Sequence, residues 1–513
     1  SAAMTKLARS VGVALPVPSL PSRLGVGDLG PAAYVFAERL ARSGIWYWQL
    51  LPWGPTTPAL GNSPYNTLSA FAGNPLWISP ELLYADGLCR RVELGRLRPY
   101  APAIEYEELT RERLAFLKAC FDHTARWRRL QVDFENFCQQ EAWWLEEWAL
   151  FAFLREHHRE APWYQWTPEY RRCEGQALSA LRRREAKQLR FHAWVQFLFF
   201  RQLKQLYQWC HGLGVELIGD LPLFVAYDSV DVWAHQTNFL LAADGRLEYV
   251  SGAPPDAFNP RGQLWGQPLY RWEHHRAEGF QWWRRRIEHL LRYVRWLRVD
   301  HFRGYSACWA VPASASDAAD GQWIPVPGEE LFQNLQRRWM PLPLLPEDLG
   351  TITPDVELLR LRFGLPSMRV FVFAFPEPAA SPHAPHNYGS NCVVYSSVHD
   401  IPPVRGWFQQ ASEHIRKSLA KYCGKVLRDR TVHREVLRLV LQSAAWLVVV
   451  PVQDFCGLGL EARLNHPGIA HGNWRWRLPL GLPRKRQWEE LAEMCALYGR
   501  SRYHAGNIVR QHG

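Results

Sequence analysis

Short apolar runs alternate with longer amphipathic stretches through the C-terminal two-thirds of the chain. The runs are rich in Val, Ile, Leu and aromatic residues, which is typical of strands buried on both faces of a sheet. The strand candidates are residues 215–224, 296–302, 342–345, 369–375, 392–397 and 446–452. Such alternation indicates βαβ units and a parallel sheet, and we expect an α/β fold in which the sheet closes into a (β/α)8 TIM barrel.

One of the expected helices is marked at both ends. Thr353 stands at the N-cap position, Pro354 at the first helical position and Asp355 in the first turn, whereas Gly364 follows the last turn. These residue types favour those positions. The pattern therefore predicts a helix that begins at Pro354 and ends before Gly364.

The N-terminal part has a different character. Residues 12–80 are rich in Gly, Pro, Ser and Asn, with an early strand candidate at 46–51, and residues 82–212 have almost wholly helical patterns. This is more helix than one barrel crossover needs. We expect one barrel domain over residues 4–513 with a helical insertion subdomain at 82–212, and we interpret residues 1–3, before Met4, as a remnant of cloning.

Composition narrows the classes of protein. Hydrophobic residues make up 47% of the 513 residues, which favours a large core over disorder. No apolar run reaches the roughly 18 residues of a membrane span, and the start of the chain lacks a secretory apolar region. The ten cysteines form no CxxC pair, which indicates reduced thiols and no zinc site. We expect a cytoplasmic protein that does not associate with a membrane and binds no metal or other cofactor.

The net charge and the number of tryptophans each allow two interpretations. The net charge of +11 is compatible with an anionic partner, but the arginines are spread along amphipathic helices, so solvated helix faces are the preferred interpretation over nucleic-acid binding. The 26 tryptophans can be core residues, and an indole can also lie against the C–H face of a sugar.

Carboxylates stand where the apolar runs stop. In a barrel these strand ends meet at the C-terminal face, so side chains that are distant in sequence are expected to converge there. The residues at these ends are Asp220, Asp300, Glu347, Asp348, His399 and Asp400.

Arg298 and Asp300 share one face of a strand because they are two residues apart. A neighbouring positive charge keeps a carboxylate ionised, and an ionised carboxylate can act as a nucleophile. Paired with a second, protonated carboxyl group about 5 Å away, it would suit retaining glycosidic chemistry. Each of these residues can instead be a helix cap or part of a structural ion pair, and the strand-end pattern alone leaves that choice open.

The same residues lie in motifs that resemble the 4-α-glucanotransferases called amylomaltases or disproportionating enzymes, which are related to the α-amylase clan. The resemblance runs from about Gly12 to Leu478. It includes WQLLPWGPT (48–56), GNSPYNTLSAFAGNP (61–75), IGDLPLFVA (218–226), PPDAFNPRGQLWGQPLY (254–270), RVDHFRG (298–304), PGEELF (327–332), EDLGTITP (347–354) and GNWRWR (472–477).

The resemblance implies a catalytic barrel that cleaves α-1,4-glucans and transfers the glucan to the 4-hydroxyl of another sugar. Asp300 would be the nucleophile of a covalent glucosyl-enzyme, Glu347 the general acid and base, and Asp400 the transition-state stabiliser. The other residues implied to contact glucans or maltooligosaccharides are Ser63, Tyr65, Asp220, Phe258, Gln263, Trp265, Arg298, His301, Asp348, His399 and Asn465. The oligomeric state is left open, with a monomer favoured.

The chain departs from the family pattern near the same face. Relatives usually have T-H-D-N-D-T where this chain has VHDIPP (398–403), and they often have an aromatic residue at the position of Ala257. They usually have Ala at Pro346 and Gln at Val372. These changes put the handling of the acceptor in question, and they keep open a glucan-binding protein or a mainly hydrolytic relative with weakened transfer.

Overall fold

The computed structural model describes residues 7–257, 259–350 and 352–503. Residues 1–3, interpreted as a cloning remnant, and Phe258, a predicted substrate contact, lie outside the described residues.

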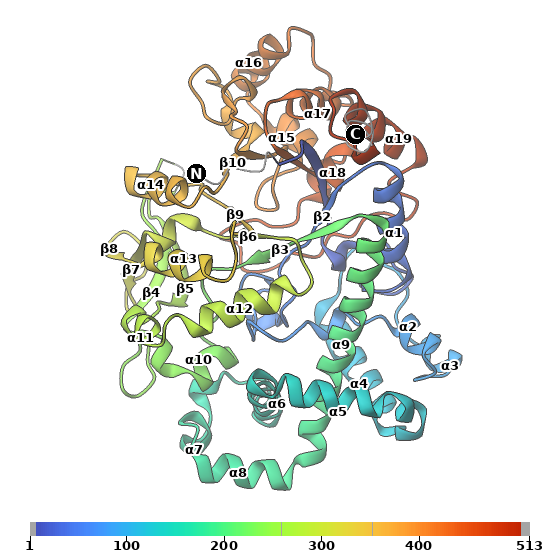
Figure 1. The fold of residues 1–513 in the computed structure, drawn as a ribbon, viewed down its shortest axis with the longest axis vertical. Helices are drawn as coiled ribbons and strands as arrows, with labels where there is room; N and C mark the ends of the chain where they lie inside the picture. Colours follow the sequence, from blue (N-terminus) through green and yellow to red (C-terminus); the bar gives the residue numbers. More distant parts are fainter. Residues whose placement is uncertain (1–6, 258, 351, 504–513) are drawn as a thin grey trace.

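Eight parallel strands form the centre of the molecule (Figure 1). Their order is β10-β11-β12-β1-β2-β3-β6-β9, so the strands follow their order in the chain around the ring. The predicted (β/α)8 barrel is therefore confirmed. The strands are β1 (Ser10–Ala14), β2 (Tyr47–Gln49), β3 (Glu216–Leu221), β6 (Trp296–Val299), β9 (Leu344–Pro346), β10 (Ser367–Val370), β11 (Cys392–Tyr395) and β12 (Leu447–Pro451).

Two strand predictions differ from the structure. β1 was not among the expected strands, although it pairs with both β2 and β12. The predicted strand at 369–375 ends at Val370, where the chain continues as a 3-10 turn, Phe371–Ala374. Phe371 and Val372 are buried, and a buried turn has the same apolar composition as a buried strand.

Asp348 lies at the seam between β9 and β10, the two strands at the ends of the hydrogen-bonded order. Its Oδ1 accepts a hydrogen bond of 2.8 Å from the backbone N–H of Met368 in β10. A side chain at the end of β9 thus binds the backbone of the neighbouring strand and helps to close the ring.

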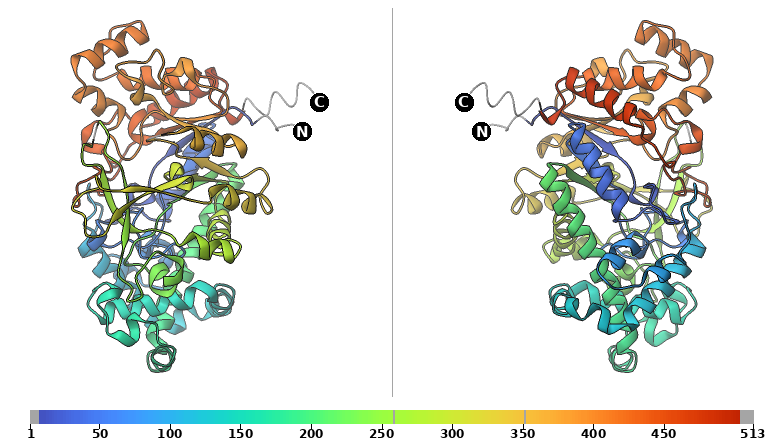
Figure 2. Two further views of the ribbon diagram at one scale, coloured as in Figure 1. Left: turned by 90° about the vertical axis from the view of Figure 1, so that its left-hand side faces the viewer. Right: turned by 90° about the vertical axis from the view of Figure 1, so that its right-hand side faces the viewer.

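Helices surround the barrel and lie above and below its strands in the view of Figure 1, as the turned views of Figure 2 also show. The predicted helix at 354–363 is confirmed as α14, with Pro354 in its first turn. The Thr353 hydroxyl bonds the Asp355 carboxylate and does not cap a backbone N–H. The helices outside the crossover from β2 to β3 are α1 (Pro31–Arg42), α10 (Val230–Ala234), α11 (Trp272–Ala277), α12 (Gln281–Leu291), α13 (Gly328–Gln336), α14 (Pro354–Arg362), α15 (Val404–Gln410), α16 (Glu413–Cys423), α17 (Val432–Gln442), α18 (Val452–Phe455) and α19 (Lys485–Leu497).

The crossover from β2 to β3 is largely helical, and its helices occupy the lower part of Figure 1. They are α2 (Pro80–Ala85), α3 (Arg91–Leu94), α4 (Tyr106–Asp122), α5 (Gln131–Gln140), α6 (Ala142–His157), α7 (Pro168–Arg171), α8 (Gly175–Arg184) and α9 (Ala186–Leu213). α9 packs against both α6 and the barrel helix α1. The helices thus fall where the sequence indicated, and their status as a separate subdomain stays a prediction.

A second sheet, which the sequence analysis missed, stands beyond the barrel. Its antiparallel order is β5-β4-β7-β8, formed by β4 (Tyr249–Ala253), β5 (Gln263–Pro268), β7 (Ala307–Pro312) and β8 (Gln322–Pro325). β4 and β5 follow barrel strand β3, and β7 and β8 follow β6. Both pairs therefore extend from the carboxyl ends of barrel strands.

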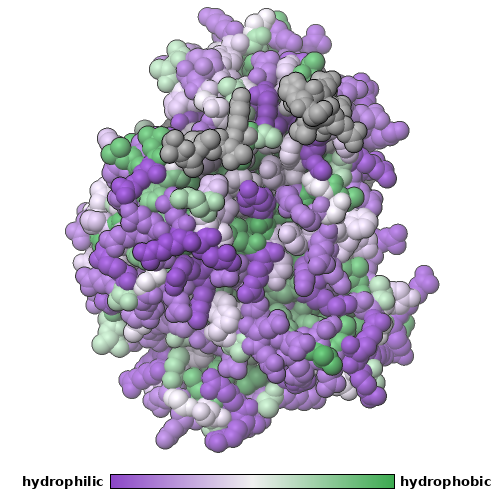
Figure 3. Space-filling view, viewed as in Figure 1, coloured by the Kyte–Doolittle hydropathy of each residue, from purple (hydrophilic) through white to green (hydrophobic). Residues whose placement is uncertain are grey.

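The face in Figure 3 is mainly hydrophilic, with apolar side chains in scattered patches. Within the described residues, every helix is too short or too polar to cross a membrane.

Two buried glutamines fasten α9 to the loop that precedes α2. Gln196 donates to the carbonyl of Gly73 at 3.0 Å and accepts from its N–H at 2.7 Å. Gln202 makes the same pair of bonds with Ser79. Each amide thus satisfies one donor and one acceptor of a buried backbone segment.

We expect Gln196→Leu to lower the free energy of unfolding by about 3 kcal/mol, because each buried polar group left without a partner costs about 1–3 kcal/mol. Urea unfolding followed by tryptophan fluorescence measures the change. Gln208→Leu, at an exposed position of the same helix, is the control. An equal effect of both substitutions would contradict the role given to Gln196.

Candidate active site

A cavity of about 540 Å³ lies between the carboxyl ends of the barrel strands and the antiparallel sheet. This volume lies within the roughly 300–1000 Å³ of a typical small-molecule site. Asp300, Glu347 and Asp400 all line it, so the three predicted carboxyl groups meet at one cavity. The other predicted residues along its wall are Ser63, Tyr65, Gln263, Trp265, His301, His399 and Asn465.

Arg298 lies between two carboxylates beneath the cavity floor. Its Nη1 is 3.1 Å from Oδ2 of Asp220 and 3.3 Å from Oδ1 of Asp300. Asp220 is its register partner on β3, which brings the two buried side chains together. Burial disfavours the guanidinium charge, yet Asp220 and the other nearby anionic groups raise the pKa of Arg298 well above its usual value. Arg298 therefore keeps its charge and orients Asp300.

Glu347 follows β9 and has a different environment. Its Oε2 accepts from the N–H of His301 at 2.8 Å, and its Oε1 accepts from the N–H of Leu349 at 3.1 Å. Burial, with a further contribution from the charge of Asp300, raises the pKa of Glu347 to about 8 despite the nearby Arg298. A carboxyl group of this kind is protonated at neutral pH and can donate a proton.

His301 is held in a form that accepts protons poorly. Its backbone is left-handed, with φ of 50°, and its ring meets Trp265 edge to face at 4.7 Å. Burial, together with Arg303, lowers its pKa to about 4. The imidazole is therefore neutral at pH 7 and suited to hydrogen bonding.

Asp400 lies in the loop after β11. Its Oδ1 accepts from Nδ2 of Asn465 at 2.7 Å, and its Oδ2 is 3.4 Å from Nε2 of His399. Arg463 donates to its backbone carbonyl at 2.8 Å. The ring of His399 stacks on Tyr65 at 5.0 Å, and the Tyr65 hydroxyl donates to Asp220 at 2.6 Å. Tyr65 thus connects the two sides of the site.

Three predicted residues contribute from outside the cavity wall. Asp220 and Arg298 are buried below it, whereas Asp348 faces the seam of the barrel. Arg360 and Arg369 approach Asp348 at 3.8 Å, so its charge is compensated away from the cavity. These positions support indirect roles for the three residues.

Sequence reasoning missed several residues of the wall, including Leu264, Gln267, Trp323 and Trp474. Gln267 donates to the Tyr65 carbonyl at 3.2 Å and fixes the turn that carries this tyrosine. Leu264 and Gln267 lie in the quoted motif at 254–270 and Trp474 lies in the quoted GNWRWR motif, so both motifs were usable signals. Trp323 stands on the antiparallel sheet, which no sequence pattern had indicated.

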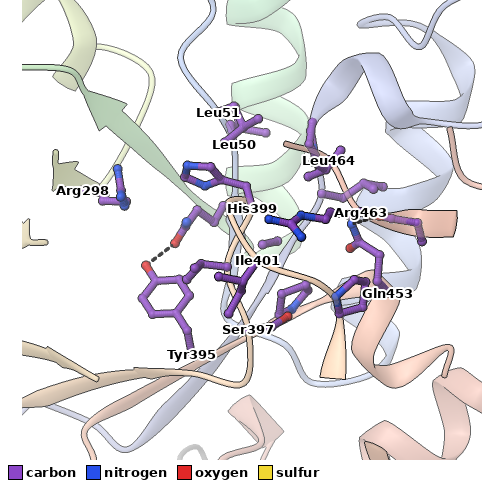
Figure 4. Close-up of a pocket in the computed structure, with 18 residues that line it drawn as sticks. Leu50, Leu51, Arg298, Tyr395, Ser397, His399, Ile401, Gln453, Arg463 and Leu464 are labelled. Carbon is purple, nitrogen blue, oxygen red and sulfur yellow. Dashed lines mark hydrogen bonds between the residues drawn. The ribbon is translucent and has the colours of Figure 1, made fainter. Parts of the chain in front are cut away.

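A smaller cavity of about 50 Å³ lies inside the barrel next to the site (Figure 4). His399 lines both cavities, and the Tyr395 hydroxyl donates to Gln49 at 2.7 Å in the inner one. Ile401 and Pro403, two positions at which the chain differs from the family pattern, line this inner cavity together with Leu50, Leu51 and Leu464. The apolar replacements therefore pack on the inner side of the loop, and the contacts of Asp400 itself remain.

Within the described part of the chain, no cluster of three or more His, Cys, Asp or Glu side chains is arranged to hold a metal ion.

Comparisons with known proteins agree over most of the chain. A family model described as 4-alpha-glucanotransferase matches residues 15–482. The 4-alpha-glucanotransferase of Aquifex aeolicus (strain VF5) is 40% identical over 492 residues, which cover 96% of this chain and 99% of the relative. That of Thermus thermophilus is 42% identical over 482 residues, covering 92% and 95%.

Solved structures are similar as well. The amylomaltase from Streptococcus agalactiae in complex with acarbose has a TM-score of 0.93 and 30% identity, covering 96% of this chain and 100% of that one. The amylomaltase from Corynebacterium glutamicum has a TM-score of 0.79 at 20% identity, covering 95% and 75%, and this likeness concerns the fold alone.

We expect Asp220→Asn to destabilise the protein by about 3 kcal/mol, because removing one partner of a buried ion pair leaves the charge of Arg298 compensated by Asp300 alone. Urea unfolding measures the loss. Glu413→Gln removes one partner of the exposed Lys417–Glu413 pair and serves as the control, with little change expected. A similar result for both variants would show that Asp220 does not compensate Arg298.

Proposed function

The chain belongs to the 4-alpha-glucanotransferase family, and from this premise we propose that Asp300, Glu347 and Asp400 perform its transfer reaction. One observation carries the assignment: three carboxyl groups border one cavity, yet their surroundings differ. Asp300 contacts a buried arginine, whereas Glu347 has a pKa raised to about 8. Such a difference separates a nucleophile from an acid.

In the first step, a carboxylate oxygen of Asp300 attacks the anomeric carbon of the donor glucan. The bond from that carbon to the bridging oxygen breaks, and Glu347 gives its proton to the departing oxygen. A glucosyl ester on Asp300 and a shortened glucan result. Asp400, held by Asn465 and His399, binds hydroxyls of the distorted ring.

In the second step, Glu347 is ionised and takes the proton of an acceptor 4-hydroxyl. The acceptor oxygen attacks the anomeric carbon, the ester bond breaks, and Asp300 leaves as a carboxylate. The two inversions give net retention of configuration. A bound sugar hydroxyl outcompetes water because positioning gives it a high effective molarity.

We propose α-1,4-glucans and maltooligosaccharides as donors and acceptors. The names of the relatives and the acarbose in the Streptococcus agalactiae structure support carbohydrate binding here. We further propose that the enzyme acts as a monomer in the cytoplasm without cofactor or metal. Ten free cysteines are consistent with a reducing compartment.

The VHDIPP departure motivated a binding protein or a hydrolase. The contacts of Asp400 with Asn465, His399 and Arg463 favour a working site. Three of the four altered residues, Val398, Ile401 and Pro403, line the inner cavity. We therefore retain transfer as the proposed main activity.

Incubation with maltotriose tests this function. We expect the wild type to yield glucose and maltooligosaccharides longer than maltotriose, and we expect Asp300→Asn and Glu347→Gln each to lower turnover at least 1000-fold, as loss of a covalent or acid–base group does (about 10³ or more). Thin-layer or anion-exchange chromatography of the products over time is the measurement. Glu493→Gln, at an exposed position of α19, is the control. Products of glucose and maltose alone would refute transfer, and an active Asp300→Asn variant would refute the assigned roles.

The pKa of Glu347 gives a pH dependence. Because this carboxyl group must be protonated in the first step, kcat/KM for the donor should be maintained through neutral pH and fall tenfold per unit above about pH 8. The contribution of Glu347 to stability falls in the same direction. Because its pKa is higher in the folded than in the unfolded protein, this contribution is present at low pH and is lost as the pH rises toward 8. Initial rates from pH 5 to 10 measure the profile. A fall that begins near pH 5 would contradict the raised pKa.

A further inference from the structure

A row of side chains crosses the antiparallel sheet on the face that borders the cavity. Leu264 of β5 is in register with Gly252 of β4, Gly252 with Trp309 of β7, and Trp309 with Trp323 of β8. Directly paired residues point to the same face of a sheet. Leu264, Gly252 and Trp323 all line the cavity. We call these four residues the apolar row.

The apolar row exposes surface that a folded core would normally hide. Leu264 is 43% exposed and Trp323 is 38% exposed. Gly252 lies against the neighbouring strand, because a Cβ there would be only 2.4 Å from the carbonyl oxygen of Gln263. The row is therefore an apolar wall that is exposed at its two ends, Leu264 and Trp323.

Two neighbouring side chains hold Trp323 in place. The guanidinium of Arg303 lies 4.0 Å from the centre of its ring, and Trp309 packs against it at 5.1 Å and 69°. A cation over an indole face and an edge-to-face partner both fix the ring orientation. A fixed indole loses little conformational entropy when a ligand binds against its remaining surface.

Arg303 connects Trp323 to the turn that holds Glu347. Arg303 lies over the Trp323 ring and is two residues beyond His301, whose N–H donates to Glu347. A second group of rings on the cavity wall, Tyr65, His399 and Trp474, contact one another, and His399 approaches Asp400. In the proposed mechanism Glu347 serves the departing oxygen and then the acceptor hydroxyl. We assign Trp323 to the acceptor side because it is connected to Glu347.

We propose that the apolar row, with Trp323 as its main contact, binds the acceptor glucan and sets the preference for a sugar acceptor over water. This inference rests on the proposed function, because it uses Glu347 to define the acceptor side. The C–H face of a glucose unit would lie against the indole, and the acceptor hydroxyls would remain free for polar contacts. Trp323 is a specificity-determining residue in this assignment.

The test uses an α-maltotriosyl fluoride that lacks the 4-hydroxyl of its terminal glucose as donor, and maltose as acceptor. This donor cannot accept a glucan itself, so fluoride release in the absence of maltose reports the first step and transfer to water. We expect Trp323→Ala to raise the maltose concentration for half-saturation about tenfold, the effect of losing roughly 1.4 kcal/mol of contact. Fluoride release without maltose should stay within twofold of the wild-type rate.

Two further variants keep the result interpretable if Trp323→Ala folds poorly. Trp323→Phe retains an aromatic ring and should stay within threefold of the wild type, whereas Leu264→Ala should raise half-saturation about threefold. Trp209→Ala, which removes a 40%-exposed tryptophan from α9, is the matched control and should change neither quantity.

An unchanged maltose dependence in Trp323→Ala and Leu264→Ala would overturn the proposal, as would an equal loss of fluoride release and transfer. Failure of the proposed function has a different signature. In that case Asp300→Asn would release fluoride at the wild-type rate, whatever the variants of the apolar row do.

Discussion

The buried positive charge of Arg298 is the constraint around which the catalytic end of the barrel is arranged. The residue is 6% exposed, and an isolated charge at such a depth would cost several kcal/mol. Asp220 compensates it from the neighbouring strand, Asp300 from the end of its own strand, and the Tyr65 ring lies 5.8 Å from the guanidinium. Because Tyr65 also donates to Asp220, one charge fixes two strands and a turn. The orientation of the proposed nucleophile follows from this electrostatic requirement.

The positive charge of Arg298 does not decide the pKa of Glu347, the proposed acid. Arg298 favours the ionised form of Glu347, yet burial and the charge of Asp300 outweigh it, and the pKa rises to about 8. Direct contact with the guanidinium belongs to Asp220 and Asp300. Glu347 instead accepts two backbone N–H groups, which orient it without supplying a full positive charge. Two carboxyl groups at the ends of adjacent strands thus have different partners: Asp300 touches the arginine, and Glu347 accepts backbone N–H groups.

The barrel was predictable because its strands are short, apolar and separated by helices, and parallel pairing then follows from connectivity. The convergence of Asp300, Glu347 and Asp400 was predictable for the same reason, since barrel strand ends share one face. The direction in which a single side chain points was not predictable. Asp348 adjoins Glu347 in sequence, yet it accepts a hydrogen bond from the backbone of β10. Likewise, β1 was hidden in a glycine-rich segment, and the antiparallel sheet was hidden because edge strands such as β5 alternate exposed and half-buried residues without a strong apolar run.

Tryptophan content shows where composition stops being informative. Trp48, Trp163 and Trp233 are buried and donate to backbone carbonyls, which is the behaviour of core residues. Trp323 is the same residue type, but it stands on a strand beyond the barrel, with the Arg303 guanidinium 4.0 Å from its ring centre. The sheet that carries it is built from the segments that follow β3 and β6, the strands of Asp220 and Asp300. The apolar row and the catalytic charges are therefore connected through the same segments of the chain. Their structural requirements differ, because the charges must be buried and paired, whereas the apolar row must be exposed. Sequence changes in these segments can consequently alter which acceptor is used while the Arg298 network stays intact.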